Sequence, residues 1–199
     1  IERQIEQRTA MLTGVSHDLR TILTRFKLQL ALGGNRPDRE ALDQDINDMQ
    51  SMLEGYLAFA RGEGGEDPGL FDLAAFLEKL VEEARLRKRT LTTSLSGSPE
   101  IHVRPNAFSR LLSNIVGNAM RYARNIEVKA SHARGSLLIV IDDDGPGIPP
   151  EKREDVFKPF LRLDTARNLD ASGTGLGLSI ARDIARSHGG DITLEDSPL

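Results

Sequence analysis

The sequence contains neither cysteine nor tryptophan, and its 199 residues include only two tyrosines and seven phenylalanines. The lack of cysteine excludes disulfides, thiol chemistry and cysteine-ligated metals, and agrees with a reducing compartment. No run approaches the roughly 18 consecutive apolar residues that a membrane-spanning helix needs. The formal net charge is −4, so the chain lacks the basic stripe with which proteins neutralise a nucleic-acid backbone. These absences argue against nucleic acid as a partner and against membrane contact by this part of the protein.

Apolar residues recur at heptad spacing through the first 60 residues. They are Ile5, Leu12, Val15, Leu19, Ile22 and Phe26, and then Leu42, Ile46, Met49, Leu53, Tyr56 and Ala60. Between the two sets, "GGNRPD" combines helix-stopping glycines with a proline suited to starting a helix. We predict an antiparallel helical hairpin over residues 1–61, which forms a homodimeric four-helix bundle because a lone hairpin leaves its apolar stripes half covered. The periodicity starts at Ile1, so we expect the helix to continue upstream in a longer protein.

A glycine-rich and acidic stretch over residues 62–70 indicates a flexible linker, and a mixed pattern of helix and strand follows over residues 71–199. Asp72 can cap a helix, and Pro105 can begin another that runs to about residue 123. Alternating or continuous apolar runs predict strands at 90–95, at 191–196 and on both sides of a turn at 135–136, with the strand after this turn buried. A short helix is expected near 150–157 and a longer one at about 175–187. These elements predict an α+β sandwich with one helical layer over a mixed sheet.

His17 falls on the outward side of the first predicted helix, and Thr21 and Thr24 follow it along the same strip. A lone histidine at such a position is most simply a solvated surface residue. Alternatively, it is an accessible nucleophile whose ring proton the neighbouring Asp18 accepts. The local sequence leaves both interpretations open. The remaining histidines show no ligand spacing and are interpreted as structural: His102, His132 and His188.

Polar residues form one strip of the helix predicted after Pro105. Asn114 and Asn118 are one turn apart, Arg121 continues their line, and Tyr122 lies at its edge. Two amides, a guanidinium and an aromatic ring could hold a metal-bound polyphosphate and stack a base. The same residues could equally be the polar face of an ordinary amphipathic helix.

Two glycine-containing segments complete the candidate site. In "DDDGPGI", Asp143 ends a predicted strand, and Gly145 and Gly147 allow the backbone to turn tightly beside a ligand, which suits an exocyclic amino group. The simpler interpretation is an acidic turn. In "GTGLGL", glycines lead directly into a helix, whose first amides favour an anion such as a triphosphate. The spacing matches neither the dinucleotide fingerprint nor a Walker P-loop.

The order of the motifs resembles one family along essentially the whole chain. "HDLRT", "NIVGNAMRY", "DDDGPGI", "FKPFLR" and "GTGLGL" are similar to the H, N, G1, F and G2 boxes of two-component sensor histidine kinases, in sequence and approximate spacing. The wording "SHDLRT" and "DDGPGI" resembles the osmosensing EnvZ type. The resemblance implies a dimerisation and phosphoacceptor hairpin followed by an ATP-binding domain of the GHKL or Bergerat type. It also implies a cytoplasmic part of an inner-membrane sensor kinase.

The resemblance further implies a role for each matching residue. His17 would accept the γ-phosphoryl group of ATP, Asp18 would activate it, and Thr21 would help to remove phosphate from a partner response regulator. Asn118 would ligate Mg²⁺. The nucleotide would be held by Asn114, Arg121, Tyr122, Asp143, Gly145, Gly147 and Arg162, and at its phosphate end by Gly173, Thr174, Gly175, Leu176 and Gly177. Residues 148–172 would form an ATP lid.

Two departures from the family pattern stand out. Ile22 replaces the usual proline one turn after the histidine, and we expect it to straighten and stiffen the helix and to alter the balance of kinase and phosphatase activity. The family commonly adds another strand after "GGDITLEDS", where this sequence ends at Leu199.

From the order of its motifs, an autophosphorylating histidine kinase is the leading hypothesis for this protein. A catalytically impaired, nucleotide-binding dimeric scaffold is the alternative, and an ATPase of the chaperone or mismatch-repair kind fits less well because such proteins lack the hairpin.

Overall fold

The computed structural model of the chain describes residues 66–159, 161 and 175–199. The helical hairpin predicted over residues 1–61 lies outside these residues. The chain divides into two compact units, residues 1–62 with 158–176, and residues 63–157 with 177–199. The second unit contains every helix and strand described below.

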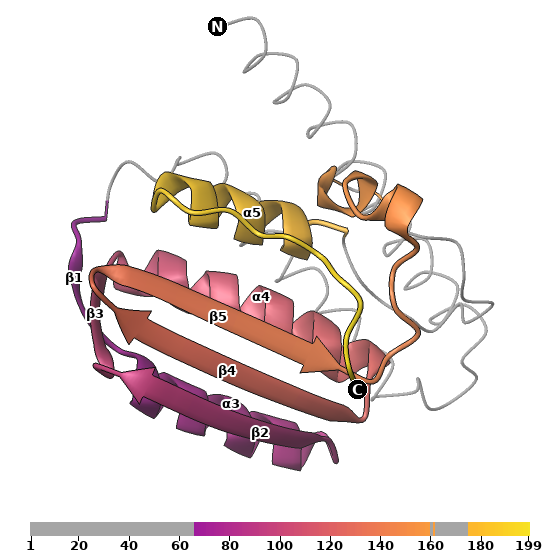
Figure 1. Cartoon of the computed structure of the whole chain (residues 1–199), viewed down its shortest axis with the longest axis horizontal. Coiled ribbons are helices and arrows are strands. Elements are labelled where there is room, and N and C mark those ends of the chain that lie inside the picture. The colour runs from indigo at the N-terminus through magenta and orange to yellow at the C-terminus, as the bar shows by residue number, and fades with distance from the viewer. Residues whose placement is uncertain (1–65, 160, 162–174) are drawn as a thin grey trace, which may run out of the picture. The chain divides into compact units, whose positions relative to one another are not determined.

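A mixed three-stranded sheet forms one layer of this unit (Figure 1). Strand β4 (Asn125–Ala133) lies in the middle, pairing in parallel with β2 (Thr90–Gly97) and antiparallel with β5 (Ser136–Asp143). A separate two-stranded antiparallel sheet joins β1 (Gly69–Asp72) to β3 (Glu100–Val103). The sequence predicted β2, β4 and β5, whereas β1 and β3 were missed. β1 takes its first two residues from the stretch that was interpreted as linker.

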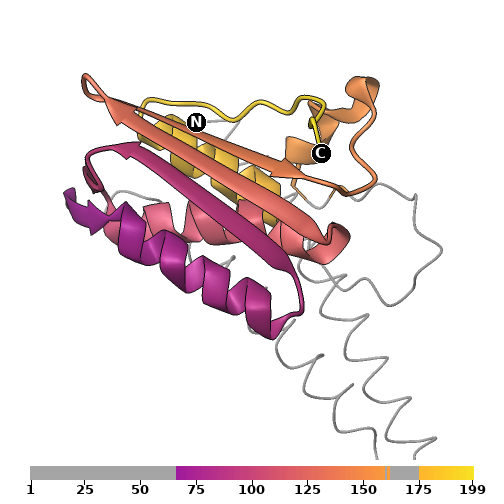
Figure 2. The ribbon, with the colours of Figure 1, turned by 60° about the horizontal axis from the view of Figure 1, so that its bottom comes forward.

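Three helices cover one face of the three-stranded sheet, as Figures 1 and 2 show from two directions. They are α3 (Leu73–Leu86), α4 (Pro105–Tyr122) and α5 (Gly177–Ser187), and two short 3-10 helices, η1 (Pro150–Lys152) and η2 (Asp155–Phe157), precede α5. Between helices and sheet lies one hydrophobic core, whose fully buried large side chains are Leu73, Leu80, Leu112, Val116, Ile126, Val128 and Ile184. The predicted helical layer over a mixed sheet is confirmed for this unit.

The two longer helices begin with different caps. At α3, the side chain of Asp72 accepts a hydrogen bond of 2.9 Å from the backbone N–H of Ala75, as its position in the sequence predicted. At α4, Pro105 occupies the first turn, and the N-cap residue Arg104 makes no side-chain cap. The cap comes instead from Glu66, whose two carboxylate oxygens accept the N–H groups of Asn106 and Ala107. A residue from the predicted linker therefore completes the start of α4.

Two predictions about the C-terminal half were wrong. β5 is not buried throughout: Leu138 and Val140 are 63% and 39% exposed, because the helices cover only one face of the sheet. Residues 191–196 form no strand in the structure. Here the N–H of Ile192 donates to the side chain of Asp191, which diverts it from a strand ladder. The short helix expected near 150–157 is present as the two 3-10 turns η1 and η2.

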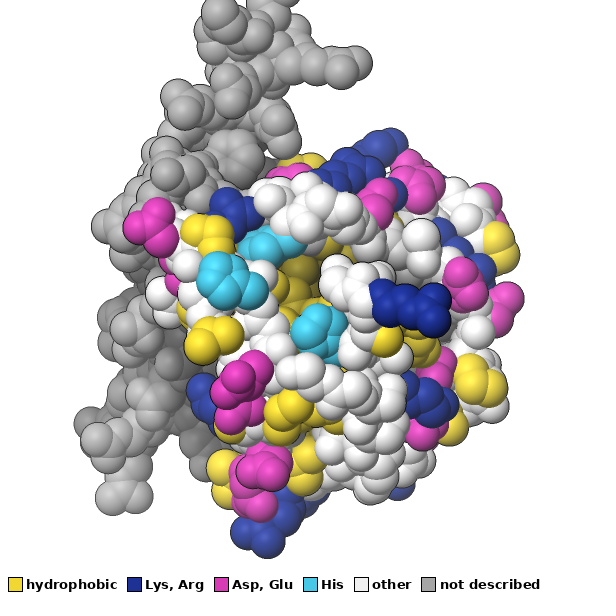
Figure 3. Space-filling view, turned by 60° about the vertical axis from the view of Figure 1, so that its left-hand side comes forward, with side chains coloured by type: hydrophobic (Ala, Val, Ile, Leu, Met, Phe, Trp, Pro, Cys, Tyr) yellow, Lys and Arg dark blue, Asp and Glu magenta, His cyan; other side chains and the backbone are white. Residues whose placement is uncertain are grey.

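The three described histidines, His102, His132 and His188, gather on one face around a hollow with a hydrophobic floor (Figure 3). Within residues 66–159 and 175–199, no group of three or more histidine or acidic side chains is placed to hold a metal ion. His188 joins two helices, since its Nε2 accepts the N–H of Arg104 at 3.1 Å while its Nδ1–H donates to the carbonyl of Ile184 at 2.8 Å. This confirms a structural interpretation for His188. None of the helices in the described part of the chain has the length and apolar character needed to cross a bilayer.

Candidate functional site

The polar strip of α4 is present as the sequence predicted. One face of the helix is buried through Ala107, Phe108, Leu111, Leu112, Val116, Ala119 and Met120. Asn114 and Asn118 are half-buried, and Arg121 and Tyr122 are exposed at the C-terminal end. Neither asparagine side chain has a hydrogen-bond partner among the residues that the structure describes. Partly buried amides left unpaired are free to bind a ligand, since burial without a partner is otherwise unfavourable.

Three consecutive aspartates at the end of β5 have three different sets of partners. Asp142 points to the outer face of the sheet. There the Nζ of Lys129 lies 3.5 Å from Oδ2 of Asp142 and 2.8 Å from Oε2 of Glu127. Asp143 points the other way, and its Oδ1 accepts the N–H of Gly145 at 2.9 Å. Among the described residues, no group bonds to its second oxygen. Asp143 is thus half-buried, with one acceptor atom that has no partner in the described part of the chain.

Asp144 joins the end of β5 to the start of β4 by hydrogen bonds. One of its oxygens accepts the N–H groups of Arg124 and Asn125 at 2.7 and 2.9 Å, and the other accepts the side-chain amide of Asn125 at 2.7 Å. The hydrogen bond from the N–H of Asn125, followed by that of Arg124, lowers the pKa of the Asp144 carboxyl below its ordinary value. Sequence reasoning did not distinguish Asp144 from its neighbours.

Gly145 lies between Asp143 and the end of α4. A Cβ atom at this position would be 2.6 Å from Oδ1 of Asp143 and 3.5 Å from the carbonyl oxygen of Tyr122. The absence of a side chain therefore lets the turn approach the aspartate closely and brings Asp143 near Tyr122. Gly147 follows with φ of +71°, a conformation that favours glycine. The structure thus brings together Tyr122, Asp143 and Gly145, as expected for one wall of a site.

The N-terminus of α5 lies beside the polar strip of α4. A Cβ atom on Gly177 would be 3.9 Å from Cβ, Cγ and Oδ1 of Asn114, so the two helices approach closely at this point. The helix has 11 residues, and the N–H groups of its first turn lack partners within the helix. A phosphate group is a suitable acceptor for them. Gly177 and Asn114 are therefore adjacent, as one phosphate-binding region requires.

The structure does not test every predicted site residue. His17, Asp18, Thr21, Arg162, Gly173 and Thr174 lie outside the described residues. Gly175 adopts φ of +67°, and Leu176 directly precedes α5 in sequence. Both belong to the other compact unit of the chain. Their roles stay predictions.

Two further residues support the site without having been singled out from the sequence. Glu66 completes the first turn of α4, and Arg182 of α5 forms ion pairs with Glu154 and Asp191. The sequence shows Arg182 only as a charged residue in the second turn of an amphipathic helix, which does not indicate its partners. Partners 28 and 40 residues away cannot be read from local spacing.

Comparisons with known proteins agree with this arrangement. The family of histidine kinase-, DNA gyrase B-, and HSP90-like ATPases matches residues 103–199. The sensor histidine kinase CpxA of Escherichia coli K12 is 35% identical over an alignment of 211 residues, which covers 100% of this chain and 46% of CpxA. The chain spans about half the length of the curated relatives it matches.

Solved structures show the same fold. The histidine kinase AdeS of Acinetobacter baumannii superposes with a TM-score of 0.64 at 24% identity, covering 86% of each chain. The ATP binding domain of PrrB from Mycobacterium tuberculosis superposes with a TM-score of 0.52 at 29% identity, covering 67% of this chain and 90% of that one. Residues 103–199 thus match the family of histidine kinase-, DNA gyrase B-, and HSP90-like ATPases, in a chain that is similar over its whole length to sensor histidine kinases.

Proposed function

We propose that this protein is an ATP-dependent histidine kinase that phosphorylates its own His17 and passes the phosphoryl group to an aspartate of a response regulator. Residues 1–61 form the homodimeric phosphoacceptor hairpin. Residues 62–70 connect it to the ATP-binding domain of residues 71–199, whose fold also includes Glu66 and the first two residues of β1. The proposal includes phosphatase activity toward the regulator, in which Thr21 takes part.

The adenine end of the nucleotide lies at the wall formed by Asp143, Gly145 and Tyr122. The Oδ2 of Asp143, which no described residue contacts by a hydrogen bond, accepts one from the exocyclic amino group of adenine. The hydrogen bond from the N–H of Gly145 holds the carboxylate in place. Gly145 leaves room for the flat base, Gly147 continues this wall, and the backbone carbonyl of the exposed Tyr122 lies beside Gly145. This half-buried carboxylate with one free oxygen is the observation that carries the proposal.

The phosphates extend from this wall toward the start of α5. Phosphate oxygens bind the first N–H groups of α5, which begins at Gly177. The family resemblance alone adds Arg162, Gly173, Thr174, Gly175 and Leu176 to this end of the nucleotide. Asn114 and Arg121 contribute polar groups from α4. Asn118 would hold a Mg²⁺ ion, because its half-buried amide oxygen is unpaired among the described residues. The ion would supply positive charge that stabilises the negative charge developing on the phosphates.

Transfer takes place at the imidazole of His17. One ring nitrogen bonds to the γ-phosphorus, the bond from that phosphorus to the β–γ bridging oxygen breaks, and ADP leaves with the electron pair. The proton on the other ring nitrogen passes to Asp18. A carboxylate oxygen of the regulator's aspartate then bonds to this phosphorus as the bond from phosphorus to the ring nitrogen breaks, and the proton returns from Asp18 to restore neutral His17.

The proposal is tested by incubating the whole chain with γ-labelled ATP and Mg²⁺. We expect a label that is stable in alkali and labile in acid, that is absent from His17→Gln and that moves to a receiver domain. Asp143→Asn should bind nucleotide more weakly while keeping its fold. Tight nucleotide binding with no label in the wild-type chain would instead support the impaired dimeric scaffold.

A further inference from the structure

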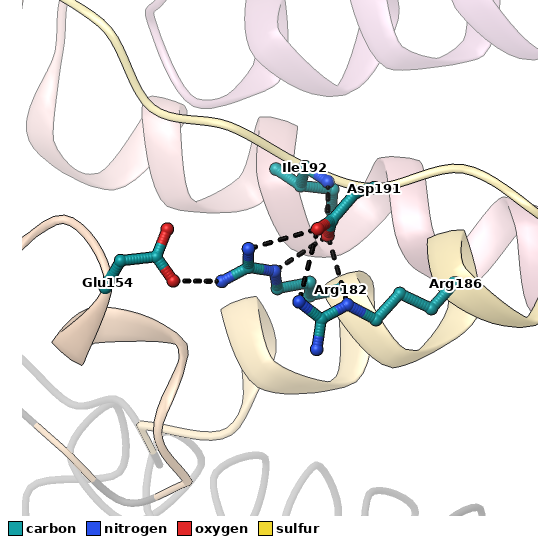
Figure 4. A network of polar contacts seen from close by, with 5 residues as sticks. All are labelled: Glu154, Arg182, Arg186, Asp191 and Ile192. Carbon is teal, nitrogen blue, oxygen red and sulfur yellow. Dashed lines mark hydrogen bonds and ion pairs between the residues drawn. The ribbon is translucent and has the colours of Figure 1, made fainter.

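Arg182, in the second turn of α5, has two carboxylate partners from different segments (Figure 4). Its Nη1 lies 2.8 Å from Oε2 of Glu154, between η1 and η2. Its Nε and Nη2 donate to the two oxygens of Asp191 at 2.7 and 3.1 Å. The Arg182 side chain is only 12% exposed, so these acids compensate for the loss of water around the guanidinium.

The guanidinium also stacks on an aromatic ring. Its Cζ atom lies 4.3 Å from the ring centroid of Phe157, and Phe157 is 8% exposed. A planar cation over a ring face at this distance is attractive, and the buried position strengthens the attraction. Lysine has neither the planar shape nor the donors to make all three contacts at once. Arg182 thereby joins α5 to both Glu154 and Phe157.

These contacts lie where the chain leaves and re-enters its compact unit. The unit ends at Phe157 and resumes at Gly177, so residues 158–176 attach to it at these two points. Arg182 contacts Phe157, the first of these points, and follows Gly177, the second, by five residues in the sequence. At that second point, Gly177 lies against Asn114. A rotation or shift of α5 would therefore move its first N–H groups relative to the polar strip of α4.

We propose that Arg182 is a positioning residue, which sets the place of the α5 N-terminus for binding the phosphates of the nucleotide by joining α5 to Glu154 and Phe157. This inference rests on the proposed function, because it assumes that ATP phosphates bind at the start of α5. It assigns no contact between Arg182 and the nucleotide. Its prediction is a selective loss of phosphate binding, with adenosine binding preserved.

Arg186 provides a matched control. It lies one turn further along the same helix, and its Nε and Nη2 bond the same Asp191 at 3.3 and 3.2 Å. No hydrogen bond or ion pair joins Arg186 to Glu154 in the described part of the chain. Arg186→Gln thus removes the same charge from the same helix, and it breaks the contact with Asp191 alone.

The experiment measures the affinities of ATP and adenosine for the whole chain by displacement of a fluorescent nucleotide, alongside thermal melting. We expect Arg182→Gln to weaken ATP binding about five-fold with less than about two-fold change for adenosine. Arg182→Lys should be intermediate and Arg186→Gln unchanged. Glu154→Gln should weaken ATP binding in the same direction and add little on top of Arg182→Gln, because both changes break the contact between Arg182 and Glu154. Glu154 is 81% exposed, so this variant keeps the test valid if Arg182→Gln does not fold.

The outcomes separate the inference from the proposed function. A wild-type chain that binds no ATP overturns both. If wild type binds ATP, equal losses for ATP and adenosine in Arg182→Gln, or an equal effect of Arg186→Gln, overturn the positioning role alone. A selective loss of ATP that Glu154→Gln shares supports it.

Discussion

Oε1 of Glu66 accepts a hydrogen bond of 2.7 Å from the backbone N–H of Asn106, although the two residues are 40 apart in sequence. The other oxygen, Oε2, accepts the N–H of Ala107 at 3.0 Å. The N-cap residue Arg104 makes no side-chain cap. The carboxylate of Glu66, which precedes β1, instead neutralises the positive end of the α4 dipole.

Glu66→Gln should destabilise the ATP-binding domain by about 1 kcal/mol at neutral pH, the usual value of a helix cap. Burial alone would raise the pKa of Glu66, but the hydrogen bonds from Asn106 and Ala107 outweigh it and lower the pKa below 4.5. The stabilisation is therefore complete above about pH 4.5 and is lost as the pH falls through the lower pKa of the folded state. Urea unfolding of wild type and variant between pH 7 and pH 3 measures this difference.

Asp67→Asn is the control for Glu66→Gln, because Asp67 is the next residue in sequence and is exposed. It should change the free energy of unfolding little at any pH. A Glu66→Gln effect that stays constant down to pH 3 would contradict the capping role of an ionised carboxylate.

Gly145→Ala should weaken ATP binding by roughly ten-fold or more. This is the size of effect expected when a charge-assisted hydrogen bond to the ligand is lost. The added methyl group would lie 2.6 Å from Oδ1 of Asp143 and push the carboxylate from its place. Calorimetric titration with ATP measures the loss. Retained affinity in a folded Gly145→Ala protein would mean that Asp143 does not hold the base.

Gly117→Ala tests the same kind of change where the structure leaves space. Gly117 is in the interior of α4, and apart from its two chain neighbours and the helix's own backbone no atom of the described residues lies within 4 Å of an added Cβ. Because alanine favours a helix more than glycine does, the variant should be more stable by about 0.5–1 kcal/mol. Its unfolding midpoint in urea should rise, and a fall would show that the helix is strained at this position.

His188→Ala should lower the stability of the domain by about 1 kcal/mol, because it leaves the partly buried N–H of Arg104 without its acceptor. It also removes an edge-to-face contact with Phe108, whose ring centroid is 6.0 Å away. His102→Ala is the control, since His102 is exposed. Thermal melting of both variants should separate them clearly, and equal melting temperatures would contradict a joining role for His188.

Local patterns were sufficient to predict the elements whose signals lie within them. Asp72 caps α3 and Pro105 begins α4 as predicted, because capping and proline preferences act within one helical turn. β1 and β3 could not be found in this way, since each has four residues and exists through pairing with the other. Tertiary contacts also explain the error at residues 191–196, where Asp191 bonds both Arg182 and its own neighbour's N–H.

In the candidate site, too, local patterns predicted some features, whereas others depend on tertiary contacts. The motifs placed Asn114, Asn118, Tyr122, Asp143 and Gly145 near one another, and the structure confirms the adjacency of the last three. The motif singled out Asp143, but the sequence did not predict the partners of the chemically identical Asp142 and Asp144. Their roles depend on which strand or helix end each one faces, and that is decided by the sheet register.

The alternation of these three carboxylates has a consequence for how the protein can evolve. Because side chains of a strand alternate in direction, deletion of a single residue within β5 would move each acid into the surroundings of its neighbour. The acceptor that faces the proposed base would then turn outward, toward Lys129. Changes in length should thus be tolerated far less than conservative exchanges in this strand, and natural insertions should gather in the turn at Arg134 and Gly135 instead.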